Sequence, residues 1–205
     1  YRIQHIASVS KTLTATLALR ILDLYNVPLS AKIKNYLPSH WNIHSRVTDI
    51  RFRNILRHKS GFNTQGAATS YSALKTSIET GDADPNLRGV SRTYDNRNFG
   101  LFRLLIPYIA NAAYMQNQET VGLTQGNLDN HLADKCEILY ENWMRFLIMA
   151  PLGFYNVDTK YDGTDPLNTL CYNFPVDGNP GNAGPDYGPF SGGGGWVMSA
   201  YMLAK

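Results

Sequence analysis

Residues 8–25 are the stretch that most limits what this chain can fold into. Ser8 precedes a long apolar run that carries Lys11 near its beginning, and Asn26 and Pro28 mark its end. Apolar residues occupy most sides of a helix wound through this run: Val9, Leu13, Ala15, Leu17, Ala18, Leu19, Ile21, Leu22 and Leu24. A helix that is apolar on most sides is usually buried. The sequence therefore predicts a core helix over 8–25, with Ser8 as its N-cap.

Lys11 follows Ser8 by three residues, which places both side chains on one face of the predicted helix. A serine hydroxyl is a weak nucleophile until a base takes its proton. A lysine amine can be that base when it is uncharged, and burial among apolar side chains lowers the pKa of a lysine toward that state. Ser8 and Lys11 are therefore a candidate nucleophile and base. The alternative is a capping serine beside a lysine whose amine reaches solvent.

The rest of the sequence predicts further helices between long polar segments. They cover 47–58, with Thr48 or Asp49 as the cap, 97–114, kinked or interrupted at Pro107, and 135–150, ending before Pro151. Loops are predicted over 62–92, 116–134 and 155–190, and the glycines of 192–195 precede the start of a short helix. Because no long alternating strand pattern is present, the sequence predicts a mainly helical chain.

Length and composition indicate one globular domain over residues 1–205. No apolar run is long enough to span a bilayer. No signal peptide is evident, so the chain resembles an excised or mature piece, and its cellular compartment is not predicted. Cys136 and Cys171 are the only cysteines, and free thiols are favoured over a bridge between them.

Charge is unevenly distributed along the chain. Residues 1–103 hold 15 Lys and Arg against 6 Asp and Glu, whereas residues 104–205 hold 4 against 10. A basic half can attract anions, nucleic acid included. No nucleic-acid-binding motif accompanies the charge, so a solvated basic face is favoured and no nucleic-acid partner is predicted.

Two other groups of residues are rival sites. Ser60 lies in "RHKSGF", but the hydrolase elbow Gly-x-Ser-x-Gly needs a glycine where this chain has His58, so Ser60 is predicted to be structural. His40 and His44 have the spacing of two metal ligands on a helix. Pro38 argues against a helix there and no third ligand is evident, so neither a metal nor a cofactor is predicted.

Six stretches carry a family resemblance, in this order along the chain: "IASVSKTLTATLALRIL", "VPLSAKIKNYLP", "VTDIRFRNILRHKSGF", "RTYDNRNFGLFRLLI", "APLGF" and "GGGGWVMSAYMLAK". Together they resemble the serine β-lactamase and penicillin-binding-protein superfamily. The resemblance is greatest to its class C β-lactamase branch, with its esterase and peptidase relatives. It covers essentially the whole chain.

The resemblance implies a role for four residues. Ser8 attacks a carbonyl and becomes acylated, Lys11 takes its proton, and Tyr94 passes a proton to the leaving group. Asn96 hydrogen-bonds either the substrate's amide or the lysine, and the backbone N–H of Ser8 is one oxyanion donor. The alternative for Tyr94 and Asn96 is a turn pair before a helix. The implied partner is a small-molecule or peptide acyl substrate: an amide, an ester or a β-lactam.

Parts of the family pattern are not found. The third motif, Lys-Thr-Gly or His-x-Gly on a strand, and the N-terminal strands have no match. The resemblance therefore predicts the helical lobe of a β-lactamase/transpeptidase-like α/β fold, with most of the sheet-forming N- and C-terminal parts missing. Two smaller departures are Met202, where the family usually has an aspartate, and an apparent insertion at 115–135.

Three expectations follow from these departures. Apolar surface should be exposed around the helix that starts at Ser8, where a partner chain could cover it. The 205-residue piece alone should turn over substrate weakly, because it lacks the strand that gives the second oxyanion donor. The alternative function is a non-catalytic pseudo-enzyme or binding fragment of the same fold. A secreted or periplasmic location is compatible with the resemblance.

Overall fold

The computed structural model describes residues 2–64, 66–160, 169–170, 178 and 186–205. Its helices are α1 (Ser10–Leu24), α2 (Phe52–Leu56), α3 (Tyr71–Thr80), α4 (Arg97–Gly100), α5 (Phe102–Ala110), α6 (Ala112–Gln118), α7 (Gln125–Met144) and α8 (Ala200–Ala204). The 3₁₀ turns are Ala7–Val9, Ile33–Tyr36, Ala150–Leu152 and Gly188–Phe190, and Arg145–Met149 is a π-turn. The strands are β1 (Gln4–His5) and β2 (Val197–Met198). Over the described residues the chain is mainly helical, which confirms the predicted fold class.

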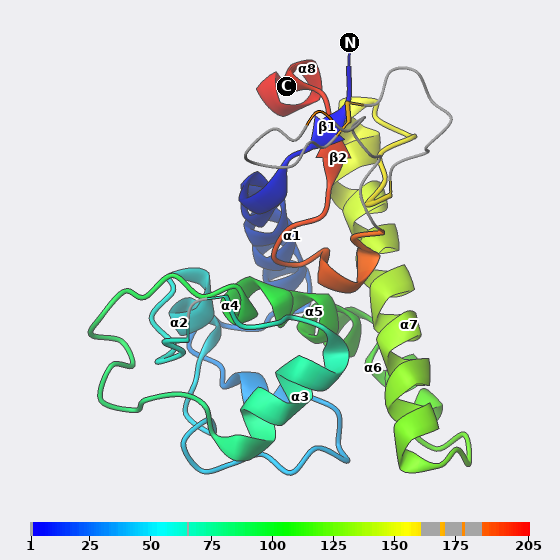
Figure 1. The fold of residues 1–205 in the computed structure, drawn as a ribbon. Helices are drawn as coiled ribbons and strands as arrows, with labels where there is room; N and C mark the ends of the chain where they lie inside the picture. The colour runs from blue at the N-terminus through cyan, green and yellow to red at the C-terminus, as the bar shows by residue number, and fades with distance from the viewer. Residues whose placement is uncertain (1, 65, 161–168, 171–177, 179–185) are drawn as a thin grey trace.

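The two strands bring the ends of the described chain together. β1 and β2 pair antiparallel, with Gln4 opposite Met198 and His5 opposite Val197. The N–H of Ile6 extends this pairing by donating to the carbonyl of Trp196 at 3.0 Å. Figure 1 shows both termini at the same end of the molecule, beside the first turn of α1. The pairing therefore places the residues before Ser8 next to the glycines of 192–195.

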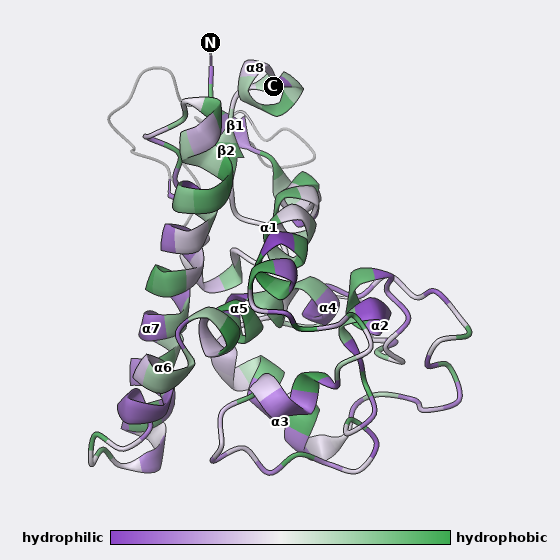
Figure 2. Ribbon diagram, turned by 180° about the vertical axis from the view of Figure 1, so that it is seen from behind, coloured by the Kyte–Doolittle hydropathy of each residue, from purple (hydrophilic) through white to green (hydrophobic). Residues whose placement is uncertain are grey.

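Helices α1, α5 and α7 contact one another and enclose the core. Leu17 and Ile21 of α1, Leu105 of α5, and Leu132 and Tyr140 of α7 are fully buried. Figure 2 shows α5 as hydrophobic over most of its length, whereas hydrophobic and hydrophilic residues alternate along α7. Complete burial of one such apolar side chain stabilises the fold by about 1.5–3 kcal/mol. This packing fixes the position of α1 and of the turn before it.

Helix α1 is close to its predicted bounds, but its surroundings differ from the prediction. It begins at Ser10, and Ser8 lies in the preceding 3₁₀ turn, where no side-chain cap is formed. Ser8 is therefore not the N-cap. Val9, Leu19 and Leu24 are exposed. The helix is buried on one side only, and the expected apolar surface where a sheet or partner chain would pack stays a prediction.

The helix predicted over 47–58 is shorter in the structure. Arg51 is extended, with φ −115° and ψ 159°, because it forms an antiparallel bridge with Lys32, and α2 starts only after it. The hydroxyl of Thr48 donates to the carbonyl of Ser45 at 2.9 Å instead of capping a helix. Neither Thr48 nor Asp49 is a cap.

Helix α3 lies inside the predicted loop 62–92, so that prediction was wrong. Ser70 caps it by accepting a hydrogen bond from the N–H of Ala73, and Gly81 ends it with φ 71°. Tyr71, Leu74 and Ile78 are its buried residues. They have helical spacing, and Ser72 and Thr76 between them are exposed.

Of the kink or interruption predicted at Pro107, the interruption does not occur there. α5 continues through it to Ala110, and the chain leaves helical geometry at Asn111, where φ is −128°. Residues 116–134 also differ from the predicted loop, because α6 extends to Gln118 and α7 begins at Gln125. Helical turns continue past Met144 through Pro151, as a π-turn and then a 3₁₀ turn. In the part of the chain that the structure describes, no helix is both long and apolar enough to cross a membrane.

Candidate active site

Ser8 lies on a sharp turn between β1 and α1. The residue before it, Ala7, has φ 44°, a left-handed conformation that costs a non-glycine residue about 1 kcal/mol or more. The side chain of Ser8 is exposed and points into a cavity. The turn therefore presents the hydroxyl to solvent just before the first turn of α1.

Lys11 lies below Ser8 on the first turn of α1. It is only 7% exposed, and its Nζ donates to Ser8 Oγ at 2.9 Å. Its Nζ also donates to the backbone carbonyl of Gly193. The spacing of three residues predicted the contact with Ser8, whereas a carbonyl 182 residues further along the chain was not predictable.

Tyr94 completes this cluster. Its Oη lies 2.5 Å from Ser8 Oγ, and Lys11 Nζ lies 5.1 Å from the centre of its ring. Partial burial alone would raise the pKa of Tyr94, but hydrogen bonding from Lys11 and Ser8 and the lysine charge outweigh it and lower the pKa below its ordinary value of 10. The Tyr94 hydroxyl is therefore easier to deprotonate than a free tyrosine.

His58 supports the ring of Tyr94. The two rings stack with their centres 4.8 Å apart, and His58 Nδ1 accepts the N–H of Asp95 at 3.3 Å. Burial, with the charges of Arg92 and Lys11 beside it, lowers the pKa of His58 below 6.5. His58 is therefore neutral at pH 7, as a hydrogen-bond acceptor at Nδ1 must be.

A buried ion pair holds the turn that contains Tyr94. Asp95 Oδ1 accepts from Arg97 Nε at 2.9 Å, and Asp95 Oδ2 accepts from Nη2 at 2.6 Å. Arg97 also donates to Ser77 of α3 at 3.1 Å and to Asp82, and it stacks over Phe62. Asp95 and Arg97 are almost completely buried. This network ties the turn to the end of α3.

Asn96 adjoins the cluster but does not bond the lysine. It precedes α4 and lines the same cavity as Ser8. Its Oδ1 is buried without a hydrogen-bond partner, so the expected alternative of a bond from Lys11 to this oxygen is not formed. The other expected role, contact with a substrate, stays a prediction.

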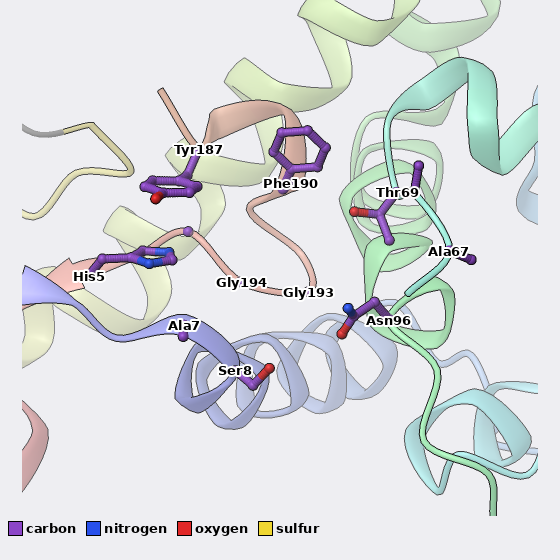
Figure 3. A pocket seen from close by; sticks show the side chains of 12 residues that line it. His5, Ala7, Ser8, Ala67, Thr69, Asn96, Tyr187, Phe190, Gly193 and Gly194 are labelled. Carbon is purple, nitrogen blue, oxygen red and sulfur yellow. The ribbon is translucent and has the colours of Figure 1, made fainter. Parts of the chain in front are cut away.

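A cavity of about 310 Å³ opens beside Ser8. Figure 3 shows His5 and Tyr187 on one side, Thr69 and Ala67 on the other, Phe190 between them, and Gly193 and Gly194 along the backbone nearest Ser8. The glycine segment is fastened to α1, because Thr14 Oγ1 donates to the carbonyl of Gly192 at 2.8 Å. The cavity is large enough for a small ligand.

The rival sites have structural explanations. Ser60 is buried, and its Oγ accepts the N–H of Phe62 at 3.2 Å. His40 Nε2 contacts Asp129 at 2.9 Å, and His44 accepts the N–H of Arg46. Across the described ranges, no cluster of three or more metal-ligating residues is found. Cys136 is a buried free thiol, and Cys171 lies outside the described residues.

The fold of this chain is shared by solved structures of low sequence identity. FmtA from Staphylococcus aureus superposes with a TM-score of 0.68 at 17% identity, covering 98% of this chain and 49% of that chain. A β-lactamase/D-alanine carboxypeptidase from Yersinia pestis gives 0.64 at 17%, with coverages of 99% and 52%. A D-stereospecific amidohydrolase from Streptomyces gives 0.66 at 17%, with coverages of 98% and 58%. The fold is the helical part of a β-lactamase/transpeptidase-like fold.

The family is shown by the sequence itself. The model of the Beta-lactamase family matches residues 3–124, more than half of the chain, and the chain belongs to that family. The search of curated proteins gives no match. The chain spans about half the length of the solved structures that it resembles.

Proposed function

We propose that Ser8 is the nucleophile of a serine hydrolase or acyl-transferase acting on an amide, an ester or a β-lactam. The observation that carries the proposal is the position of Ser8 Oγ, which contacts both Lys11 Nζ at 2.9 Å and Tyr94 Oη at 2.5 Å. A hydroxyl with two proton-carrying partners has the arrangement of an activated nucleophile. Family membership supports the same reaction class.

The reaction has two steps. In the first, Ser8 Oγ bonds to the substrate's carbonyl carbon while Lys11 takes the hydroxyl proton, and the backbone N–H of Ser8 stabilises the oxyanion. Tyr94 relays the proton to the leaving nitrogen or oxygen as its bond to the carbonyl carbon breaks. In the second, the oxygen of water or another acceptor bonds to the acyl carbon as the ester bond to Ser8 Oγ breaks. Lys11 and Tyr94 pass the acceptor's proton to Ser8 Oγ, which regenerates the hydroxyl.

The lysine's hydrogen-bond partners support this assignment. Lys11 forms no ion pair with a described carboxylate, and its second partner is the neutral carbonyl of Gly193. No neighbouring carboxylate therefore competes for the proton that the lysine exchanges with Ser8. Tyr94 has a lowered pKa and is 39% exposed, so its hydroxyl is available to pass a proton to a leaving group.

Intact-mass spectrometry of the chain after incubation with a penicillin and with p-nitrophenyl esters tests the proposal. We expect an added acyl mass that peptide mapping places on Ser8. Ser8→Ala should abolish the adduct, and Lys11→Ala should slow its formation about 10²-fold or more.

Ser60→Ala is the matched control, because it removes the rival serine and should leave the adduct intact. Acylation that persists in Ser8→Ala would refute the assignment of the nucleophile. If folded chain forms no adduct with any of these donors, the alternative stands: a non-catalytic binding domain of the same fold.

A further inference from the structure

The cavity beside Ser8 is built to select one kind of acyl group. Three of its lining side chains carry rings: His5, Tyr187 and Phe190. The rings of His5 and Tyr187 stack with centres 3.8 Å apart and an angle of 4° between them, so they form one flat wall. The lining has no Asp, Glu, Lys or Arg among the described residues.

The rings offer apolar surface rather than charge. Burial lowers the pKa of His5 below 6.5, so its imidazole is neutral at pH 7. Phe190 is 40% exposed at the cavity and stacks on no other ring of the described residues. An exposed aromatic side chain in the wall of a cavity is a ready contact for an aromatic ligand.

The opposite wall and the segment nearest Ser8 carry only small, uncharged residues. Ala67, Ala68 and Thr69 form that wall, and Gly193 and Gly194 bring bare backbone next to Ser8. A Cβ added at Gly193 would lie 3.3 Å from the carbonyl oxygen of Asn96, so the close approach of these two backbone segments favours glycine here. We call the space between this wall and the rings of His5, Tyr187 and Phe190 the slot. A flat ring fits the slot better than a branched or hydrated group.

Both walls are fixed to α5 by one buried side chain. Arg103 is 2% exposed, and it donates to the carbonyl of Thr69 at 3.1 Å and to the carbonyl of Gly188 at 3.5 Å. Phe190 is further held because its N–H donates to the carbonyl of Tyr187 at 2.8 Å. The slot is therefore formed before any ligand enters, which favours one ligand shape over others.

We infer that this cavity selects substrates whose acyl group is a neutral aromatic ring, such as a phenylacetyl group, over small aliphatic or carboxylated acyl groups, with Phe190 as the specificity-determining residue. The inference rests on the proposed function, because it assigns the group that is transferred to Ser8. No Lys or Arg lines the slot, and Lys11 behind Ser8 already donates to Ser8 and to the carbonyl of Gly193. A carboxylate in the slot therefore loses water without gaining a free cation, which disfavours it.

A competition experiment tests this inference independently of the absolute rate. The chain is incubated with equal concentrations of p-nitrophenyl phenylacetate, acetate and hemisuccinate, and the three Ser8 adducts are resolved by intact mass. Each ratio of two adducts is divided by the ratio of the rates at which imidazole in water is acylated by the same two esters. This corrects for the intrinsic reactivity of each ester. We expect phenylacetyl to exceed acetyl by about 10-fold or more, and succinyl to be the least abundant.

Phe190→Ala should reduce the phenylacetyl-to-acetyl ratio about 10-fold without abolishing acylation. Phe146→Ala is the matched control: Phe146 is also exposed, but it lies on the π-turn outside the cavity, and its loss should leave the ratio unchanged. Adducts on Ser8 in equal corrected amounts, or a ratio unaffected by Phe190→Ala, would overturn the inference while the proposed function stands. Absence of every adduct would overturn both.

Discussion

Replacing Arg97 by methionine should destabilise the protein far more than the loss of an ordinary surface charge. Arg97 is fully buried and donates to Asp95, Ser77 and Asp82. Arg97→Met keeps the apolar length of the side chain but leaves the Asp95 carboxylate, 1% exposed, with only the backbone N–H of residue 97 as a partner.

The expected magnitude follows from the burial of each carboxylate. Removing one partner of a fully buried ion pair costs about 3–5 kcal/mol, because the remaining charge is left uncompensated. The side chain of Asp82 is 42% exposed, so its share is at most about 1 kcal/mol. We therefore expect Arg97→Met to lower the free energy of unfolding by about 3–5 kcal/mol, a large fraction of the total for a typical domain.

Urea denaturation followed by far-ultraviolet circular dichroism measures this change. The double variant Asp95→Asn with Arg97→Met removes both charges, and it should be more stable than Arg97→Met alone. Lys160→Met is the control: its ion pair with Asp186 is about half exposed, and its loss should cost no more than about 1 kcal/mol. If Arg97→Met lowers the free energy of unfolding no more than Lys160→Met does, the turn that contains Tyr94 is not held by the ion pair of Asp95 and Arg97.

Three further predictions follow from titratable groups. Because the pKa of Tyr94 is lowered, ultraviolet titration should show one tyrosine ionising below pH 10 that is missing in Tyr94→Phe; an identical titration in the variant would contradict the assignment. The folded pKa of His58 lies below its unfolded value of 6.5, so the unfolded chain binds more protons between the two values and stability falls as pH drops through that window. In His58→Gln the urea midpoint should fall less as the pH is lowered than in the unchanged protein. An equal dependence of the two midpoints on pH would refute this. Burial raises the pKa of the Cys136 thiol to about 12, so iodoacetamide should label it only after unfolding, in a Cys171→Ser background; labelling of the folded chain at pH 7 would be the contrary result.

The candidate site was more predictable than the elements around it. Ser8 and Lys11 are close in sequence, and a spacing of three residues determines their contact whether Ser8 caps the helix or lies in the turn before it. Tyr94 was found only through the family resemblance, because nothing local in a turn indicates that it will meet Ser8. The carbonyl of Gly193 and the stacking of His58 depend on tertiary packing between distant segments, and no local pattern encodes them.

The missed helices have a common physical cause. α3 and the first half of α7 are rich in polar residues, so their average composition resembles that of a loop. Each nevertheless has buried residues at helical spacing, such as Leu128 and Leu132 in α7. The interruption predicted as one outcome at Pro107 does not occur, because burial of α5 compensates for the one hydrogen bond that a proline removes.

The Lys11 contact with Gly193 has a consequence for inheritance. Had a carboxylate filled this place, a single base change in its codon could remove the lysine's partner. A main-chain carbonyl is present whichever amino acid the codon specifies. A mutation can therefore remove this contact only by changing the backbone conformation of the loop. Substitution of Gly193 is limited by the short distance between its backbone and the carbonyl oxygen of Asn96, and not by any chemical group that a side chain there must supply.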